Sequence, residues 1–211
     1  MSVTSEGLDR LKTGGLAYGH ALRLIELEGP SPQAESILRG AFEPLRSAMN
    51  WLEDTSHFET AHQRLDAAGQ LAREIFPHGC HLTQENLSYY QQCPVALAHN
   101  RVGMSPGYVV REAECSICRQ DPEDCPHIKG RVYDGQTCHR IIKQLDVLEV
   151  SFVGRPAQPD ARIHRISVDR AELEAGLGEA FTPGVVVTCD RCLKPCRGVA
   201  RPFEDSDLTL E

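Results

Sequence analysis

Three cysteines and a histidine stand close together in residues 114–127, ECSICRQDPEDCPH. The pattern Cys115-x2-Cys118-x6-Cys125-x-His127 supplies four ligands of the types that zinc prefers. The two-residue gap lets both thiolates of one tight turn face a single ion, and the Cys-Pro-His unit returns a sulfur and an imidazole from a second turn. We therefore predict a zinc site here. Since four protein ligands leave no open position for water, we expect this site to be structural and not hydrolytic.

A second, incomplete set of ligands lies near the end of the chain, in the pattern Cys189-x2-Cys192-x3-Cys196. A fourth ligand must come from elsewhere, and the candidates lie in the segment PHGCH: Cys80, His81 and, less favourably, His78. Such a site would tie the C-terminal part to the end of the helical part. A second zinc is the prediction, and an iron–sulfur cluster held by four thiolates is the alternative.

Two further cysteines stand outside these patterns. Cys93 is expected to be a free buried thiol, which is the usual state of an unpaired cysteine in a core. Cys138, followed by His139, is an alternative ligand for the first site. Nine cysteines in a reducing compartment favour metal ligands over disulfides.

The composition is that of a globular protein. The 211 residues are 41% hydrophobic and 25% charged, which is enough to bury one moderate core or two small ones. The N-terminus has no apolar signal segment and no run is long enough to span a membrane, so we expect a cytoplasmic protein without membrane contact. The formal net charge is -8 and no basic cluster stands out, which makes nucleic-acid binding unlikely.

Apolar residues at helical spacing mark the first 77 residues as a helical bundle. One helix is expected up to Gly29-Pro30, with a weak middle at Gly14-Gly15. A second helix begins at Ser31-Pro32, an N-cap followed by proline, and Pro44 is expected to kink or break it. A third helix follows, and its apolar stripe consists of Phe58, Ala61, Leu65, Ala68, Leu71 and Ile75. Its histidine, His62, like His20 and His57 elsewhere in the bundle, is expected to be an ordinary solvated or core residue.

From residue 78 onward the pattern changes to strands, turns and cysteines. A short helix is expected from Thr83 through Tyr90. The segments GYVVRE, VLEVSFV, RIHRISV and GVVV have the composition of strands. We therefore predict an α+β fold with a helical bundle over 1–77 and a zinc-stapled β domain over 78–211.

Two segments resemble the phage prohead (head maturation) serine protease family. RVGMSPGYVV is similar to that family's Gly-Met-Ser-x-Gly-aromatic strand, and LDVLEVSFVGRPAQPDARI is similar to its later Leu-x-Glu-Val-Ser-x-Val and Pro-Ala-x-Pro segment. Some phage-borne relatives carry a cysteine-rich insert between the two, as this chain does. The resemblance covers about residues 99–168.

The resemblance implies roles for a few residues. Ser105 matches the position of the family's nucleophile, and Ser151 matches the serine of the later strand. A serine nucleophile needs a base within hydrogen-bond reach, and His99 is the nearest histidine in sequence. The family places its histidine on a strand well upstream, where this chain is predicted to be helical.

These observations favour a non-catalytic zinc-binding structural or protein-interaction protein, of phage or prophage-related origin, that keeps a degenerate prohead-protease-like core. Its partner is expected to be another protein. Two alternatives remain open at this point. One is an active serine endopeptidase of the head maturation type that uses Ser105, Ser151 and His99. The other is a zinc-dependent nucleic-acid-binding protein.

Overall fold

The computed structural model describes residues 3–86 and 88–203. It has helices and small antiparallel sheets, which confirms the predicted α+β class. The chain forms two compact units, one of Met1–Gly103 with Val153–Glu211 and one of Met104–Phe152. This division differs from the predicted boundary near residue 78, because residues beyond that boundary, such as Val95 and Ala98, belong to the core of the bundle. Among the described helices, none is both long and apolar enough to cross a membrane.

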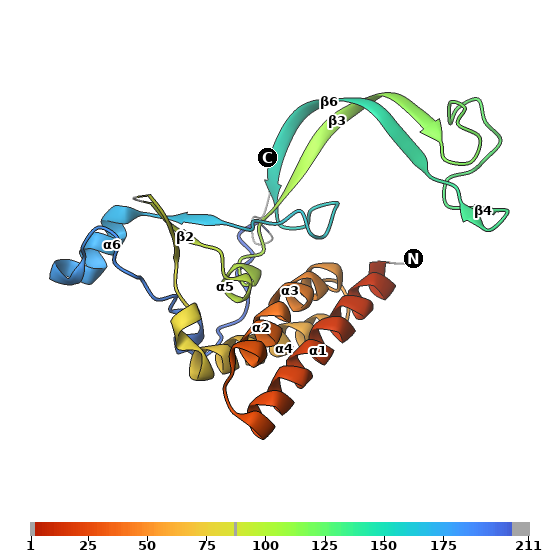
Figure 1. Ribbon diagram of the computed structural model, residues 1–211. Coiled ribbons are helices and arrows are strands. Elements are labelled where there is room, and N and C mark those ends of the chain that lie inside the picture. The colour runs from red at the N-terminus through yellow and green to blue at the C-terminus, as the bar shows by residue number, and fades with distance from the viewer. Residues whose placement is uncertain (1–2, 87, 204–211) are drawn as a thin grey trace. The chain divides into compact units, whose positions relative to one another are not determined.

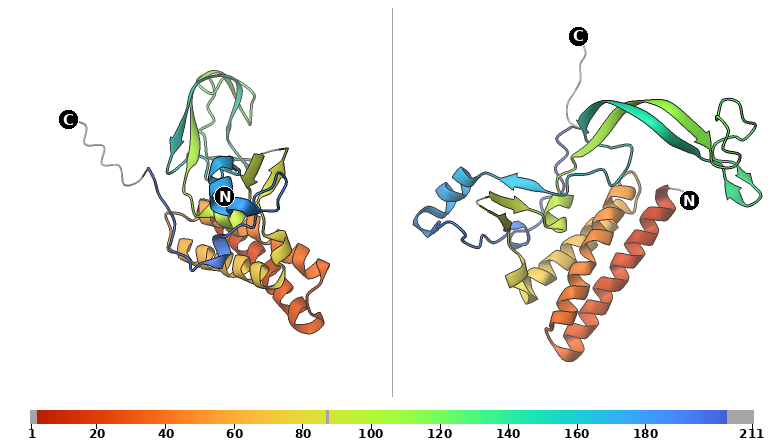
Figure 2. Two further views of the ribbon diagram at one scale, coloured as in Figure 1. Left: turned by 90° about the vertical axis from the view of Figure 1, so that its left-hand side faces the viewer. Right: turned by 45° about the horizontal axis from the view of Figure 1, so that its top comes forward.

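The first unit is built on a bundle of four helices, which lie side by side in Figures 1 and 2. They are α1 (Val3–Glu28), α2 (Pro32–Gly40), α3 (Phe42–Trp51) and α4 (Phe58–Ile75). Ser31 caps α2 as predicted, since its side chain accepts a hydrogen bond from the Ala34 N–H at 3.2 Å. The predicted second helix is divided at Ala41, three residues before Pro44, so the bundle has four helices and not three.

The expected weak point at Gly14-Gly15 is absent, because α1 runs unbroken through both glycines. A Cβ atom on Gly14 would lie 2.6 Å from Cγ of Leu45 on α3. The glycine therefore allows α1 and α3 to approach closely, and packing against the fully buried Leu45 compensates for its low helix propensity. The predicted stripe on α4 is confirmed: Ala61, Leu65 and Ala68 are fully buried, and the apolar residues around them pack against the same core.

A three-stranded antiparallel sheet follows the bundle in the first unit, in the order β1 (Thr83–Glu85), β2 (Ser88–Gln91) and β7 (Ile166–Val168). The prediction of a helix from Thr83 to Tyr90 was wrong. Tyr89 is buried and its hydroxyl donates to the Val185 carbonyl at 3.1 Å, so tertiary burial favours the extended strand over the local cap signal. Short helices complete the unit: η1 (Pro77–Gly79), α5 (Pro94–Ala98), α6 (Arg170–Leu177), η2 (Gly178–Ala180) and η3 (Arg191–Leu193).

The second unit is a long two-stranded ribbon with a cysteine-rich tip. Its strands β3 (Gly103–Cys115) and β6 (Arg140–Val153) contain the predicted segments GYVVRE and VLEVSFV and run in opposite directions (Figure 1). The tip carries a small hairpin of β4 (Val132–Tyr133) and β5 (Gln136–Thr137). Asp134 and Gly135 connect its strands with positive φ angles of 48° and 80°, which is the conformation that an Asp-Gly hairpin turn requires.

Glu53, in the turn between α3 and α4, holds three distant segments of the first unit together. Its side chain is only 6% exposed and accepts two hydrogen bonds of 2.9 Å from Arg101. Arg162 also donates to it, and Arg201 donates at 2.8 Å. Burial alone would raise the pKa of Glu53, but the hydrogen bonds and charges of these arginines outweigh burial and hold the pKa below its usual value.

Replacing Glu53 by Gln is expected to lower the free energy of unfolding by about 3–5 kcal/mol, because the variant leaves buried arginine charge without its counter-ion. Since the native pKa of Glu53 is depressed, its contribution is fully present above the ordinary glutamate pKa of about 4.3 and is lost as the pH falls below that value. Denaturant unfolding of wild type and Glu53→Gln, at neutral pH and in a descending pH series, measures both effects.

The neighbouring Asp54 provides the control. Its ion pair with Arg155, at 2.7 Å, joins side chains that are 66% and 58% exposed. Exposed pairs of this kind contribute about 1 kcal/mol or less, so Asp54→Asn should leave stability almost unchanged. Equal losses in the two variants would contradict the role given to the buried carboxylate.

Candidate metal centres

The predicted ligands at the tip of the ribbon come together in space. Cys115 ends β3, and Cys118, Cys125 and His127 follow in the turns before β4. One ligand atom from each of the four residues lies within 4.8 Å of all the others. The structure thus confirms that these four residues form a cluster that could hold a metal ion. We call it the tip centre.

The backbone around Cys115 favours its thiolate form. Hydrogen bonds from the N–H groups of Cys118 and Ile117, together with those from the thiols of Cys138 and Cys125, lower the pKa of Cys115 to about 6 although burial acts in the opposite direction. The thiolate, and not the thiol, is the form that binds a metal. Burial and the neighbouring Cys115 raise the pKa of Cys138. The thiolate of Cys115 therefore disfavours a second thiolate beside it, and a bound cation would offset that repulsion between negative sulfurs.

His127 carries an independent sign of a ligand. Its Nδ1 atom is buried and has no hydrogen-bond partner within the described part of the chain. The ring packs edge-on against Tyr133, with centroids 4.6 Å apart, and the Tyr133 hydroxyl accepts a hydrogen bond from the Ile128 N–H at 2.9 Å. A buried polar atom without a partner is costly, and binding to a metal ion would satisfy it.

A fifth candidate ligand lies beside the four. The sulfur of Cys138 is buried and only 3.7 Å from the sulfur of Cys115. This placement keeps open the alternative in which Cys138 replaces one ligand. The set of mutually close ligand atoms contains His127 and not Cys138, however, so we assign His127 to the ion and Cys138 to the surrounding layer.

Cys118→Ser is expected to abolish metal binding at the tip, because it removes one of four ligands, whereas Cys138→Ser should retain the ion. Loss of the ion should increase amide exchange in residues 115–139 and leave the helical bundle unchanged, since the ligands are confined to the second unit. Metal analysis and hydrogen–deuterium exchange of both variants measure this. Metal loss in Cys138→Ser would instead show that Cys138 is a ligand of the ion.

The second predicted set is assembled differently from the prediction. Cys189 and Cys192 line a small cavity of about 30 Å³ in the first unit, and the other two cysteines that line it are Cys80 and Cys93. The Cys189 N–H donates to the Cys80 carbonyl at 3.0 Å. A hydrogen bond from Cys93, together with others from the Arg191 backbone and the Gln91 side chain, lowers the pKa of Cys189 to about 6 against the effect of burial. We call these four cysteines the four-cysteine cavity.

Cys196 was predicted to complete this set, and the structure places it elsewhere. Cys192 lies in η3, and the chain becomes extended at Lys194, with φ -122° and ψ 150°. Cys196 lies three residues after the end of η3, and because the chain is extended there, its sulfur reaches His62 on α4. Cys93, expected to be a free thiol, takes its place in the cavity. Of the candidates for a fourth ligand, Cys80 and His81 line the cavity, whereas His78 pairs with Glu35 at 2.9 Å.

If Cys93 is the fourth ligand, Cys93→Ser should expose the backbone pairing that surrounds the cavity. The bonds to monitor are Cys189 N–H to Cys80 O at 3.0 Å and Leu82 N–H to Val187 O at 2.8 Å. Their amide exchange should rise clearly in Cys93→Ser and stay unchanged in Cys196→Ser. The reverse pattern would restore Cys196 to the original grouping.

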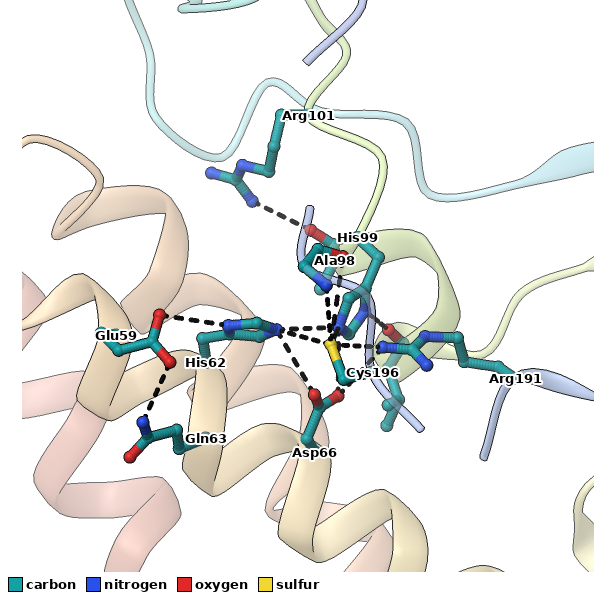
Figure 3. Close-up of polar contacts among 11 residues, drawn as sticks. Glu59, His62, Gln63, Asp66, Ala98, His99, Arg101, Arg191 and Cys196 are labelled. Carbon is teal, nitrogen blue, oxygen red and sulfur yellow. Dashed lines mark hydrogen bonds and ion pairs between the residues drawn. The ribbon is translucent and has the colours of Figure 1, made fainter. Parts of the chain in front are cut away.

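The sulfur of Cys196 belongs to a third cluster, drawn in Figure 3. His62 and Asp66 come from successive turns of α4, and His99 follows α5. The two histidine Nε2 atoms lie 3.0 Å apart, and the sulfur lies 3.3 Å from that of His62 and 3.5 Å from that of His99. The ligand atoms of all four residues lie within 4.8 Å of one another, so this group also could hold a metal ion.

The charges in this third cluster reinforce each other. The hydrogen bond to Asp66 raises the pKa of His62, although burial opposes the shift. Burial also opposes ionisation of Asp66, but its contacts with His62, His99 and Cys196 outweigh that effect, and its pKa lies far below the usual value. Asp66 is therefore a carboxylate, and it faces two imidazoles and a thiol.

Sequence reasoning missed three members of this cluster. His62 was expected to be an ordinary histidine of the bundle, Asp66 was not singled out, and His99 was considered only as a base for a serine. The available signal was the four-residue spacing of His62 and Asp66, which places both on one face of a helix.

The residues of the protease hypothesis occupy separate elements. Ser105 lies on β3 and Ser151 on β6, both in the ribbon. The ring of His99 is engaged at both nitrogens: Nδ1 lies 2.6 Å from the Val95 carbonyl, and Nε2 lies among the atoms of the third cluster. Both nitrogens of His99 thus contact residues of the first unit.

Comparisons of the chain with protein-family models, with curated proteins and with solved structures gave no match.

Proposed function

We propose that this chain is a non-catalytic zinc-binding protein that uses its β3–β6 ribbon to bind another protein. The observation that carries the proposal is the amount of apolar surface on the ribbon. Exposed large apolar side chains number four on β3 and six on β6: Met104, Tyr108, Val109, Val110, Ile142, Leu145, Val147, Leu148, Val150 and Phe152. So many exposed apolar side chains on two paired strands are typical of an interaction site.

The ribbon also needs support that its own strands do not supply. The sheet of β3 and β6 has two strands, and isolated two-stranded sheets are at best marginally stable in water. Strands of 13 and 14 residues also present long edges with unpaired backbone groups. A partner that adds a strand or covers one face would satisfy both needs.

We propose a second copy of the chain as that partner. The two strands carry three basic and four acidic side chains, so the ribbon is close to neutral although the whole chain has a net charge of -8. Like-charge repulsion therefore opposes association through the ribbon less than association through the rest of the surface. Two identical ribbons can pair about a two-fold axis, the commonest symmetry of protein oligomers.

Zinc is the metal we propose for the tip centre. Its donor set of three thiolates and one imidazole is typical of structural zinc, and four protein ligands close the site. The tip contains two buried cysteines but few buried apolar side chains, so metal binding would supply folding energy that the segment otherwise lacks. The role of this ion would be to hold the end of the ribbon in one conformation.

We propose that the ribbon has its evolutionary origin in a prohead protease, on the basis of the resemblance described above. The two similar segments include the first part of β3 and the last part of β6, so the ribbon would be what remains of a phage protease core after its catalytic function was lost. Cleavage of casein by the purified protein, abolished in Ser105→Ala, would contradict this view and favour the serine endopeptidase.

A double substitution on the ribbon tests the interaction. Leu148 and Val150 are 69% and 60% exposed, so Leu148→Lys/Val150→Lys should fold normally. It should weaken self-association at least tenfold, because the interface would have to bury two lysine charges. Sedimentation velocity over a range of protein concentrations measures association, and circular dichroism checks the fold.

The matched control is Leu27→Lys, which replaces an apolar residue 81% exposed on α1. It should leave association unchanged. If wild type stays monomeric up to about 100 µM, or if Leu27→Lys has the same effect as the ribbon variant, the second copy is not the partner.

A further inference from the structure

We propose that His62, Asp66, His99 and Cys196 bind a metal ion of the zinc class, in a centre distinct from the tip centre and from the four-cysteine cavity. The donors are two imidazole nitrogens, a carboxylate and a thiolate, all of which are zinc ligands. They come from α4, from the residue after α5 and from the C-terminal segment (Figure 3). The ion would link three segments that are distant in sequence.

The distances within the cluster are close to the edges of a zinc tetrahedron, and the shortest two, of 3.0 and 3.1 Å, lie slightly below them. Bonds of about 2.0–2.1 Å to nitrogen or oxygen and about 2.3 Å to sulfur place neighbouring ligand atoms about 3.3–3.6 Å apart. The two Nε2 atoms are 3.0 Å apart, and each lies 3.3 or 3.5 Å from the Cys196 sulfur. Asp66 Oδ2 lies 3.3 Å from His62 Nε2, and the other oxygen, Oδ1, lies 3.1 Å from His99 Nε2.

The outer hydrogen bonds direct both Nε2 lone pairs toward one point. The Val95 carbonyl can only accept, so His99 Nδ1, at 2.6 Å, carries the proton and leaves Nε2 with a lone pair. His62 Nδ1 faces the Glu59 carboxylate at 3.5 Å, which favours the same arrangement. Metal-binding histidines usually have a carbonyl or carboxylate behind the second nitrogen. Two lone pairs 3.0 Å apart repel each other unless a cation lies between them.

Two groups outside the cluster contact the Cys196 sulfur. The Gly198 N–H donates to the sulfur at 3.3 Å, and Arg191 lies 3.1 Å from it. Arg191 also lies 3.4 Å from the Asp66 carboxylate. A thiolate and a carboxylate balance the charge of a divalent ion, and two buried imidazoles complete a set typical of zinc.

The competing explanation is a proton in place of the metal, with an imidazolium shared between His62 and His99. Metal content separates the two. We expect His99→Gln and Cys196→Ser each to lose one equivalent of zinc per chain relative to wild type, as measured by inductively coupled plasma mass spectrometry on the full-length protein. The double variant should lose the same single equivalent, because both residues bind one ion.

His20→Gln is the control, since His20 is exposed on α1 and lies outside all three clusters. It should keep the full complement. Wild-type metal content in His99→Gln and Cys196→Ser, or additive losses in the double variant, would overturn the proposal. Cys118→Ser, which acts only on the tip centre, shows whether a failure concerns this centre or zinc binding in general.

Because a variant could lose its metal by misfolding, a second measurement is made on the wild-type protein. X-ray absorption at the zinc edge reports the average donor set. The tip centre and the four-cysteine cavity alone would give an almost all-sulfur shell, whereas the third centre adds three nitrogen or oxygen donors and one sulfur. A shell with a clearly larger nitrogen and oxygen share supports the proposal, and an almost all-sulfur shell refutes it.

Discussion

The fold of the first unit depends on the desolvated carboxylate of Glu53. It sits in the turn between α3 and α4, and its arginine partners come from three segments: Arg101 just before β3, Arg162 after β6 and Arg201 near the C-terminal end. Arg101 is itself only 1% exposed. A buried charge is tolerated only when it is paired and hydrogen-bonded, so each arginine restricts its segment to one position on the bundle.

Asp160 acts in the same way on α3, where its carboxylate accepts hydrogen bonds from Ser47, Asn50 and Trp51.

These polar anchors also position the candidate metal ligands of the third cluster. Arg101 fixes the chain two residues after His99, so the imidazole meets His62 on α4. The tail that carries Cys196 is held on the bundle side by Arg201 and by the bond from the Arg101 N–H to the Ala200 carbonyl, at 2.9 Å. All nine cysteines are free thiols, and each lies in or beside one of the three clusters.

Local features were predictable from the sequence and long-range ones were not. The tip ligands lie within thirteen residues, so their spacing was enough to group them. The start of α2 was predictable for a similar reason, because its cap, Ser31, is a neighbour in sequence. The sequence predicted Cys196 as a member of the four-cysteine cavity, where the structure has Cys93. Which of the two lines the cavity depends on the direction of the chain after η3, and the spacing of the cysteines does not determine that direction. The strand at Tyr89 replaced a predicted helix because its burial depends on contacts with residue 185, far along the chain. The partners of His62 were invisible for the same reason, since Cys196 is 134 residues away.

The sequence separation of the ligands bears on what each centre contributes. Cys115 and His127, the outermost ligands of the tip centre, are 12 residues apart, against 134 for His62 and Cys196. Closure entropy grows only with the logarithm of this separation, so the longer loop adds about 2 kcal/mol of constraint. The difference between the centres is therefore mainly architectural. An ion at the tip would order one end of a ribbon, whereas an ion between α4 and the C-terminal segment would join two parts of the first unit that are distant in sequence. Glu53 already holds the C-terminal segment on the bundle through Arg201, so an ion in the third cluster would reinforce an arrangement that charge pairing has set.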